Sequence, residues 1–248
     1  MPYLYDIAEE NVTGHTIWSK MGYNDAVGTS EETMWTNSSQ YVFPTTASQM
    51  EVVSSSDDDG KTGTPNSTGA KTVRIGYLKS DYSEGSVTLT LDGTTTVTTG
   101  ASHADIWRIN SFRVMTTGTN LAPVGNLTLR PAGGGTTYGY IRLGKTSARS
   151  AFYTVPLGKT LYITSIAFST VGTKYMVFTT HANYDQATST LLQRGLFHPF
   201  SEVALLNSSY TKELTTPTRL PATVDLKVSI IAEAAGSLAT CHLRGWLE

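Results

Sequence analysis

Residue types that commonly perform chemistry are present in this sequence, but their spacing matches no catalytic or metal-binding pattern. The histidines lie far apart in the chain, so no two have the short helical or hairpin spacing of metal ligands; they are His15, His103, His181, His198 and His242. A nucleophilic serine on a sharp turn would be marked by Gly-x-Ser-x-Gly, which the sequence lacks. We therefore predict a non-enzymatic protein with no catalytic residue, no cofactor and no metal ion.

The single cysteine, Cys241, lies in the stretch LATCHLRGW near the end of the chain. One cysteine cannot form an intramolecular disulfide, so stability must come from packing, from oligomerisation or from both. Free cysteine behaves as a small apolar residue, and it is among the most frequently buried residue types. We expect Cys241 to be a buried, inert thiol in the last strand.

Two further stretches resemble ligand loops in composition. Asp57–Asp59 are followed by Gly60, which suggests calcium, but the alternating oxygen ligands and the closing glutamate of a calcium loop do not follow. The run Gly133–Gly135 suggests a phosphate cradle, but no helix is expected after it. We predict a solvated loop at the first stretch and a hairpin tip at the second.

The elements that position these residues are predicted to be strands, most clearly between Lys71 and Thr99. Val73, Ile75 and Tyr77 share one parity, and after a polar turn so do Val87, Leu89 and Leu91. Side chains alternate between the faces of a strand, so the pattern predicts two half-buried strands of a hairpin.

Two further segments support strands. Trp107 and Ile109 have one parity whereas Phe112 and Val114 have the other, which predicts either a β-bulge at Asn110-Ser111 or a strand buried on both faces. Leu226, Val228 and Ile230 alternate cleanly in a later segment.

These patterns predict an all-β fold, an antiparallel β-sandwich of jelly-roll or immunoglobulin-like type in one or two units. The segment Gly69–Ile75 is similar to Gly158–Ile163, which is consistent with either a duplicated sandwich or convergent turn chemistry. We divide the chain into an extended N-terminal arm (1–39), a first β-sandwich unit (40–145) and a second β-sandwich unit (146–248).

The arm is predicted to make contacts, because it carries large apolar residues but has no clear periodicity of its own. It would dock either on its own subunit or on a neighbour. Our interface candidates are three residues of the arm and three from an aromatic loop of the second unit: Trp18, Met34, Trp35, Phe197, His198 and Phe200.

Composition excludes several partners. Only 15% of the 248 residues are charged, below the roughly 25% usual for soluble domains, and the net charge is −2. This balance offers no electrostatic attraction for nucleic acid or an anionic membrane surface. No run approaches the ~18 apolar residues of a membrane helix, and the first residues lack the pattern of a signal peptide, so we expect synthesis in the cytoplasm.

Four stretches carry a resemblance to a known family: Tyr41–Thr99, Ile106–Gly118, Phe152–Phe168 and His242–Glu248. They resemble virion proteins of tailed bacteriophages, of a kind frequent in aquatic phages. The resemblance covers most of the chain from about residue 36, and its motifs are structural rather than catalytic. It implies a head decoration (cement) protein or a tail component.

The head is favoured because the sequence lacks the coiled-coil heptads and collagen-like repeats that long fibres use. We expect a capsid decoration protein, located in the virion and bound to the major capsid protein or other virion proteins. We also expect a homo-oligomer, with a trimer favoured. The alternative is a tail-associated adaptor or receptor-binding protein that stacks host glycans on aromatic residues such as Trp18, Trp35 and Tyr184.

Overall fold

The computed structural model describes residues 2–60, 67–183 and 196–248, and the chain is all-β as predicted. Its longest helix, α1 (Pro2–Ala8), precedes the first strand. The chain divides into two compact units. Unit 1 comprises Met1–Gln40 and Ser150–Glu248, and unit 2 comprises Tyr41–Arg149. Among the described residues, no helix has the length and hydropathy needed to cross a membrane.

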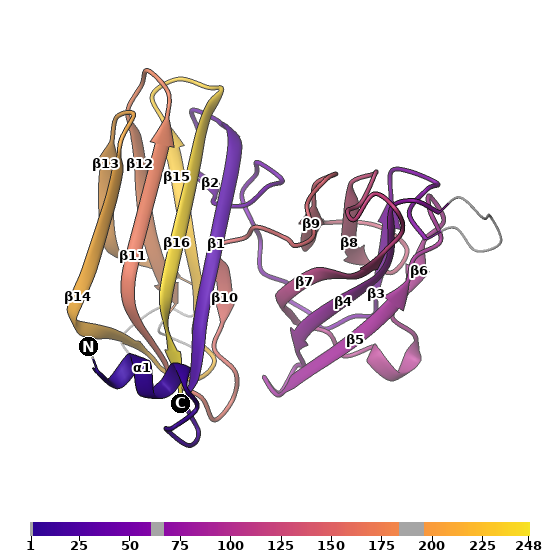
Figure 1. The fold of residues 1–248 in the computed structure, drawn as a ribbon, viewed down its shortest axis with the longest axis horizontal. Coiled ribbons are helices and arrows are strands. Elements are labelled where there is room, and N and C mark those ends of the chain that lie inside the picture. The colour runs from indigo at the N-terminus through magenta and orange to yellow at the C-terminus, as the bar shows by residue number, and fades with distance from the viewer. Residues whose placement is uncertain (1, 61–66, 184–195) are drawn as a thin grey trace. The chain divides into compact units, whose positions relative to one another are not determined.

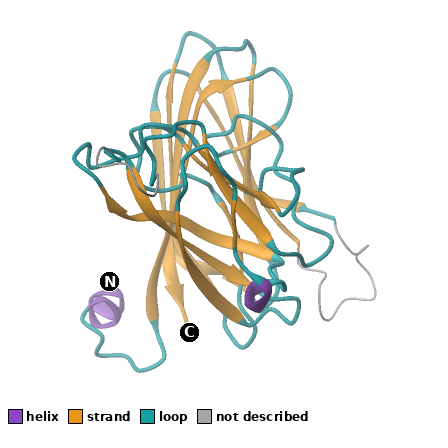
Figure 2. Ribbon diagram, turned by 90° about the vertical axis from the view of Figure 1, so that its right-hand side faces the viewer, coloured by secondary structure: helices purple, strands orange, loops and turns teal. Residues whose placement is uncertain are grey.

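Unit 1 contains two antiparallel sheets, drawn in Figures 1 and 2. Sheet A has the order β1-β16-β11-β14, with bounds Thr16–Val27, Ser237–Leu247, Leu161–Val171 and Ser209–Leu220. Sheet B has the order β10-β15-β12-β13, with bounds Phe152–Thr154, Asp225–Ala232, Met176–Asn183 and His198–Leu205. The two-residue strand β2 (Glu32–Thr33) also pairs with β15.

The strand order of unit 1 is that of a jelly roll. If the strands of the two four-stranded paths are numbered one to eight along the chain, sheet A has the order 1-8-3-6 and sheet B has 2-7-4-5. Apart from strands four and five, which pair in sheet B, successive strands alternate between the sheets in two interlocked Greek keys. An immunoglobulin-like sandwich would instead place its first two strands side by side in one sheet. Of the two predicted topologies, the jelly roll is the one that unit 1 adopts.

The core of unit 1 lies between sheets A and B. Phe168 of β11 and Phe178 of β12 stack with ring centroids 4.5 Å apart, and Trp18 of β1 meets Tyr153 of β10 edge-on at 5.2 Å. Cys241 is buried in the same cluster, as expected. Burial raises the pKa of its thiol to about 12, so the thiol is not reactive at neutral pH.

Unit 2 is a smaller sandwich of two sheets. One has the order β6-β3-β8-β9, with bounds Val97–Thr98, Met50–Ser54, Leu127–Pro131 and Gly139–Ile141. The other has the order β5-β4-β7, with bounds Glu84–Thr90, Ala70–Leu78 and Arg108–Thr117. A single cluster of buried apolar side chains, contributed by both sheets, forms its core.

The predicted hairpin of unit 2 is confirmed by the pairs Val73↔Leu89 and Ile75↔Val87. The predicted bulge is also present. Ser111 pairs with Gly76 and Ile109 pairs with Tyr77, so Asn110 is the extra residue that switches the parity of β7.

The predicted N-terminal arm is corrected by the structure. Residues 16–27 form β1, which pairs with β16 from Thr16↔Leu247 to Val27↔Ser237 and so belongs to the jelly roll. Unit 2 is inserted between β1 and β10, and the boundaries lie after Gln40 and before Ser150 rather than after residues 39 and 145. The alternation rule missed β1 because Lys20 and Gly22 follow Trp18 on its inward parity, while Ile17 and Met21 are each 48% exposed.

Candidate functional site

The strongest concentration of polar side chains next to a cavity lies on the outer face of sheet A. Cross-strand pairing places Ser19 beside Arg244, Arg244 beside Ser165, and Ser165 beside Glu213. These four residues form one row across four strands. The backbones of neighbouring strands are about 4.8 Å apart, so the backbones of Arg244 and Glu213, two strands apart, are separated by about 9.6 Å.

Hydrogen bonds hold both charged members of this row, Glu213 and Arg244. The Ser165 hydroxyl donates to Glu213 Oε1 at 2.9 Å, and the Arg244 Nε–H donates to His242 Nδ1 at 3.3 Å. Because Nδ1 of His242 accepts, a neutral ring carries its proton on Nε2. Burial lowers the pKa of His242, and the positive charge of Arg244 lowers it further.

A pocket of about 390 Å³ opens over this row. The row supplies its polar floor together with His242 and Thr164, while Leu4 of α1 and Ile17 of β1 supply apolar atoms. Trp18 also lines the pocket, and its buried indole N–H meets no hydrogen-bond partner in the described part of the chain. The pocket has the size and the mixed lining of a small-molecule site.

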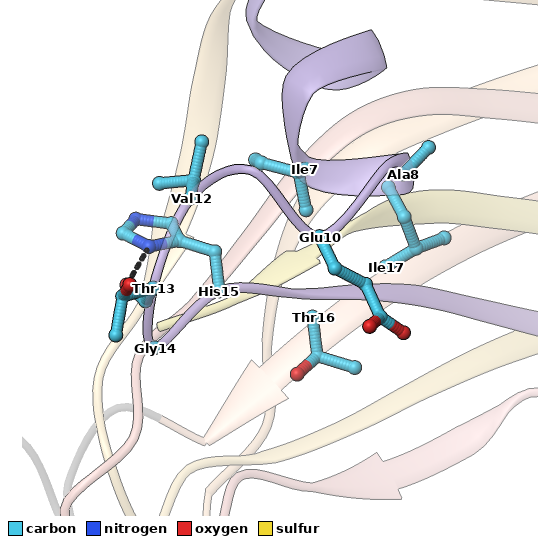
Figure 3. A pocket seen from close by; sticks show the side chains of 9 residues that line it. All are labelled: Ile7, Ala8, Glu10, Val12, Thr13, Gly14, His15, Thr16 and Ile17. Atoms are coloured by element: carbon cyan, nitrogen blue, oxygen red, sulfur yellow. Dashed lines mark hydrogen bonds between the residues drawn. The ribbon is translucent and has the colours of Figure 1, made fainter.

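A second pocket, of about 500 Å³, opens between the end of α1 and the start of β1, where the chain turns through Gly14 (Figure 3). His15 lines this pocket, and both nitrogens of its ring have partners. Nδ1 donates to the carbonyl oxygen of Thr13 at 3.1 Å, and Nε2 lies 3.0 Å from Glu248 Oε2. Its lining is one continuous segment, residues 7–17, apart from residues 9 and 11. The pocket over sheet A, which gathers residues from several strands, is the better candidate.

The arrangement on sheet A suits binding rather than nucleophilic catalysis. A serine nucleophile needs a neighbouring base that accepts its proton, usually histidine. Ser165 donates to Glu213, and His242 is engaged by Arg244 instead. The chemistry available is charge-assisted hydrogen bonding, with Arg244 as donor and Glu213 as acceptor.

Three predicted interface residues are core residues of unit 1, which corrects that prediction. Trp18, Met34 and Trp35 are 6%, 0% and 2% exposed. The Trp35 ring packs edge-on against Phe152 at 5.7 Å, and the Met34 carbonyl accepts a hydrogen bond from the Ala151 N–H at 2.8 Å. These three side chains of the supposed arm are therefore buried within their own subunit.

The other three predicted interface residues are half-buried at the edge strand of sheet B. Phe197 precedes β13 and lies under the ammonium group of Lys227, 4.8 Å from its ring centroid. Phe200 packs against the core of unit 1. His198 pairs with Ala182, and its buried Nε2 has no hydrogen-bond partner among the residues that the structure describes. Their role at an interface stays a prediction.

The aromatic residues suggested for glycan stacking do not form an exposed platform. Trp18 and Trp35 are buried, and Tyr184 lies outside the described residues. A stacking role for the first two is therefore wrong.

The two stretches with ligand-like composition have structural roles. The Asp59 carboxylate accepts from Ala70 N, Val124 N, Gly125 N and Ser54 Oγ. Gly133–Gly135 lie in the β8–β9 connection, and all three have positive φ angles, as a hairpin tip requires. Across residues 2–60, 67–183 and 196–248 there is no cluster of three or more His, Cys, Asp or Glu that could hold a metal ion.

One stretch matches the sequence pattern of a phosphate-binding loop but lacks the structure of one. Gly139–Thr146 matches Gly-x-x-x-x-Gly-Lys-Thr, the pattern of a phosphate-binding loop. Its first residues form β9, and the described chain after it continues through turns to β10 rather than into a helix. The backbone N–H cradle at a helix N-terminus is therefore missing.

An exposed apolar group, missed at the sequence level, lies at one end of the jelly roll. It consists of Val171, Tyr175 and Leu206, which are 59%, 56% and 40% exposed, and we call it the loop-end patch. The loops that carry it are joined by Thr170 N–H donating to the Ser208 carbonyl at 2.9 Å. No sequence signal identified it, because isolated apolar residues in turns are common.

Comparison with known proteins gives no family. No protein-family model matches the chain, and no curated protein matches it. Among solved structures, the infectious bursal disease virus Gt strain gives 13% identity over 100% of this chain and 87% of that chain, with a TM-score of 0.14.

The infectious bursal disease virus VP2 subviral particle gives 13% identity over 100% of this chain and 86% of that chain, with a TM-score of 0.16. These TM-scores are too low to indicate a shared fold. The description of unit 1 as a jelly roll depends on its own strand order.

Proposed function

We propose that this chain is a non-enzymatic structural protein of a tailed-bacteriophage virion, most simply a decoration protein that stabilises the head. The observation that carries the proposal is the jelly-roll strand order of unit 1. Jelly rolls recur in viral capsid proteins, and also in lectins and cupins, so fold alone does not decide between these roles. The resemblance of Tyr41–Thr99 and Phe152–Phe168 to phage virion proteins favours the first.

A decoration protein acts by burying surface against its neighbours. The loop-end patch offers apolar side chains at the β11–β12 and β13–β14 connections, and the N–H of Glu233 donates to the Tyr175 carbonyl at 2.9 Å, which ties a third connection, β15–β16, to it. Exposed apolar clusters with an aromatic member are typical of interface cores. We assign the contact with the major capsid protein or with a second copy of the chain, as in a trimer, to this patch.

The test combines copy number with attachment. In purified particles of the encoding phage, we expect the protein in high copy on the head, and we expect Tyr175→Asp with Leu206→Asp to abolish attachment while the purified protein stays folded. The matched control is Leu157→Asp, which changes a 58% exposed leucine in the β10–β11 turn at the opposite end of the strands. Normal attachment of the double variant would remove the patch from the proposal.

A tail-associated receptor-binding protein is the second candidate, and the pocket over sheet A is the observation that favours it. A few copies per particle, located on the tail by antibody labelling, would overturn the head assignment and support this candidate. Oligomeric mass of the purified chain distinguishes a trimer from a monomer in either case.

A further inference from the structure

The pocket over sheet A presents opposite charges on two strands, Arg244 of β16 and Glu213 of β14. Arg244 is exposed, and within the described residues its guanidinium makes a hydrogen bond only through Nε, to His242. Its two terminal Nη groups are therefore left to donate outward as a pair. A planar pair of N–H donors matches the two oxygens of a carboxylate.

Glu213, at the β14 end of the row, accepts rather than donates. Glu213 is exposed, and its Oε1 accepts from the Ser165 hydroxyl at 2.9 Å, which leaves Oε2 for a ligand donor. A carboxylate without a cationic partner binds neutral O–H or N–H donors through charge-assisted hydrogen bonds. Ser19 and Thr164 add hydroxyl groups to the lining.

The separation of Arg244 from Glu213 limits the class of ligand. Arg244 and Glu213 stand two strands apart, about 9.6 Å in the backbone, so a ligand that meets both side chains at once carries its carboxylate and its hydrogen-bond donors on different parts of a ring-sized body. A phosphate would bring a second negative charge close to the carboxylate of Glu213, and the repulsion between them disfavours it.

The remaining surface of the pocket is apolar. Leu4 and Ile17 stand beside the polar row, and Ile17 is 48% exposed. Such a surface suits the C–H face of a sugar ring, and the volume of about 390 Å³ falls in the range of sites for molecules of this size.

We propose that this pocket binds a monosaccharide unit that carries a carboxylate, such as a uronic acid or a sialic acid at the end of a surface glycan. Arg244 pairs with the carboxylate, the Ser165–Glu213 pair accepts from ring hydroxyls, and Leu4 with Ile17 covers the apolar face. His242 is a positioning residue, because its Nδ1 holds the Nε edge of Arg244 and leaves the Nη edge for the ligand. The site does not depend on whether the protein is placed on the head or on the tail.

The experiment uses the full chain and four probes, with binding measured by calorimetry and ligand-observed NMR. The methyl glycosides of N-acetylneuraminic acid and of glucuronic acid are compared with methyl glucoside and with acetate. We expect one acidic sugar to bind at least tenfold more tightly than methyl glucoside and than acetate, and the tighter of the two acidic sugars identifies the class.

Two variants and one control link binding to the pocket. Arg244→Gln and Glu213→Gln are each expected to weaken binding of the acidic sugar by about tenfold or more, since each removes a charge-assisted hydrogen bond. Lys212→Gln removes an exposed charge from the neighbouring position of β14, on the opposite parity, and is expected to leave binding unchanged. Circular dichroism verifies that each variant is folded.

Three results would overturn the proposal. The first is no binding of either acidic sugar by the folded protein at millimolar concentration. The second is equal binding of acetate, which would make the pocket a simple anion site. The third is an equal loss of affinity in Lys212→Gln, which would place any binding elsewhere.

Discussion

The two units solve the problem of backbone hydrogen bonding differently. In unit 1 the four strands of sheet A are 11 or 12 residues long, and most of their N–H and C=O groups pair within the sheet. In unit 2 the strands β3, β6, β8 and β9 are 2 to 5 residues long, so a larger share of the backbone lies in connections. Buried backbone groups in those connections still need partners.

Unit 2 supplies these partners from side chains. Asp59 is fully buried and takes backbone donors from the first residue of β4 and from the β7–β8 connection. Glu51, which is 4% exposed, accepts from the N–H of Gly133 and from Arg130. The carboxylates of Asp59 and Glu51 are thus committed to structure. Unit 1 satisfies its backbone within long strands, and this leaves Glu213, His242 and Arg244 on its outer face for a ligand.

The first prediction concerns the removal of β1 from sheet A of unit 1 and has the largest expected effect. Deleting residues 1–27 removes β1, exposes the edge of β16, and takes Trp18 and Val27 out of the core. We expect no cooperative unfolding transition for unit 1 and loss of solubility. Circular dichroism melting and size-exclusion chromatography measure both.

A shorter deletion provides the control. Removing residues 1–6 keeps Ile7, which is 2% exposed, and leaves β1 intact, so the unfolding transition should persist. If the longer deletion melted like the full chain, residues 1–27 would be a dispensable arm after all.

This strand also marks where sequence reasoning succeeded and where it stopped. The β4–β5 hairpin was predictable, because Val73 and Ile75, and then Val87 and Leu89, occupy every second position of two segments that turn-forming residues separate. In β1 the inward positions include Lys20 and Gly22, so hydrophobicity does not follow burial. The ammonium group of Lys20 lies over the Tyr153 ring, 5.5 Å from its centroid, and Gly22 lets the Met34 carbonyl and Cys241 come close to the strand. An alternation of apolar and polar residues predicts neither contact.

The pocket was beyond prediction for a different reason. Ser19, Ser165, Glu213 and Arg244 are far apart in the chain, and only the order β1-β16-β11-β14 places them in one row. A shift of one residue in the register of any of these strands would turn its side chain in the row towards the core, because register sets the face of every residue. Topology and register, rather than local pattern, carry the site.

The second prediction tests whether unit 2 depends on buried carboxylates. Asp59→Ala leaves three backbone N–H groups and the Ser54 hydroxyl without their acceptor, at a cost of about 3 kcal/mol in the free energy of unfolding. Urea unfolding followed by tryptophan fluorescence measures the loss. Asp58→Ala, at an exposed neighbour, should change stability by less than about 0.5 kcal/mol; equal effects of the two variants would contradict the assignment.

The third prediction returns to unit 1, where close packing replaces side-chain acceptors. A Cβ added at Gly22 would lie 2.6 Å from the Met34 carbonyl oxygen and 2.8 Å from Cys241 Sγ. That carbonyl accepts from the Ala151 N–H, so it cannot move freely. Gly22→Ala should therefore cost about 2 kcal/mol, measured by thermal unfolding. Ser19→Ala, on the exposed face of the same strand, should cost little, and a neutral Gly22→Ala would show that this contact relaxes easily.

The fourth prediction is the smallest and depends on pH. The N–H of Gly133 is the main cause that holds the pKa of Glu51 below its usual value, and Arg130 at 2.8 Å adds to it against the effect of burial. A carboxyl whose folded pKa is depressed stabilises the fold above its unfolded pKa of about 4.3, and that contribution is lost as the pH falls through the folded pKa. Glu51→Gln should therefore lower stability by about 1 kcal/mol at pH 7, and the gap between variant and parent should close as melting is followed from pH 5 towards pH 2.5. A gap that stays constant over this range would mean that the shape of the Glu51 side chain, rather than its charge, holds the glycine hairpin in place.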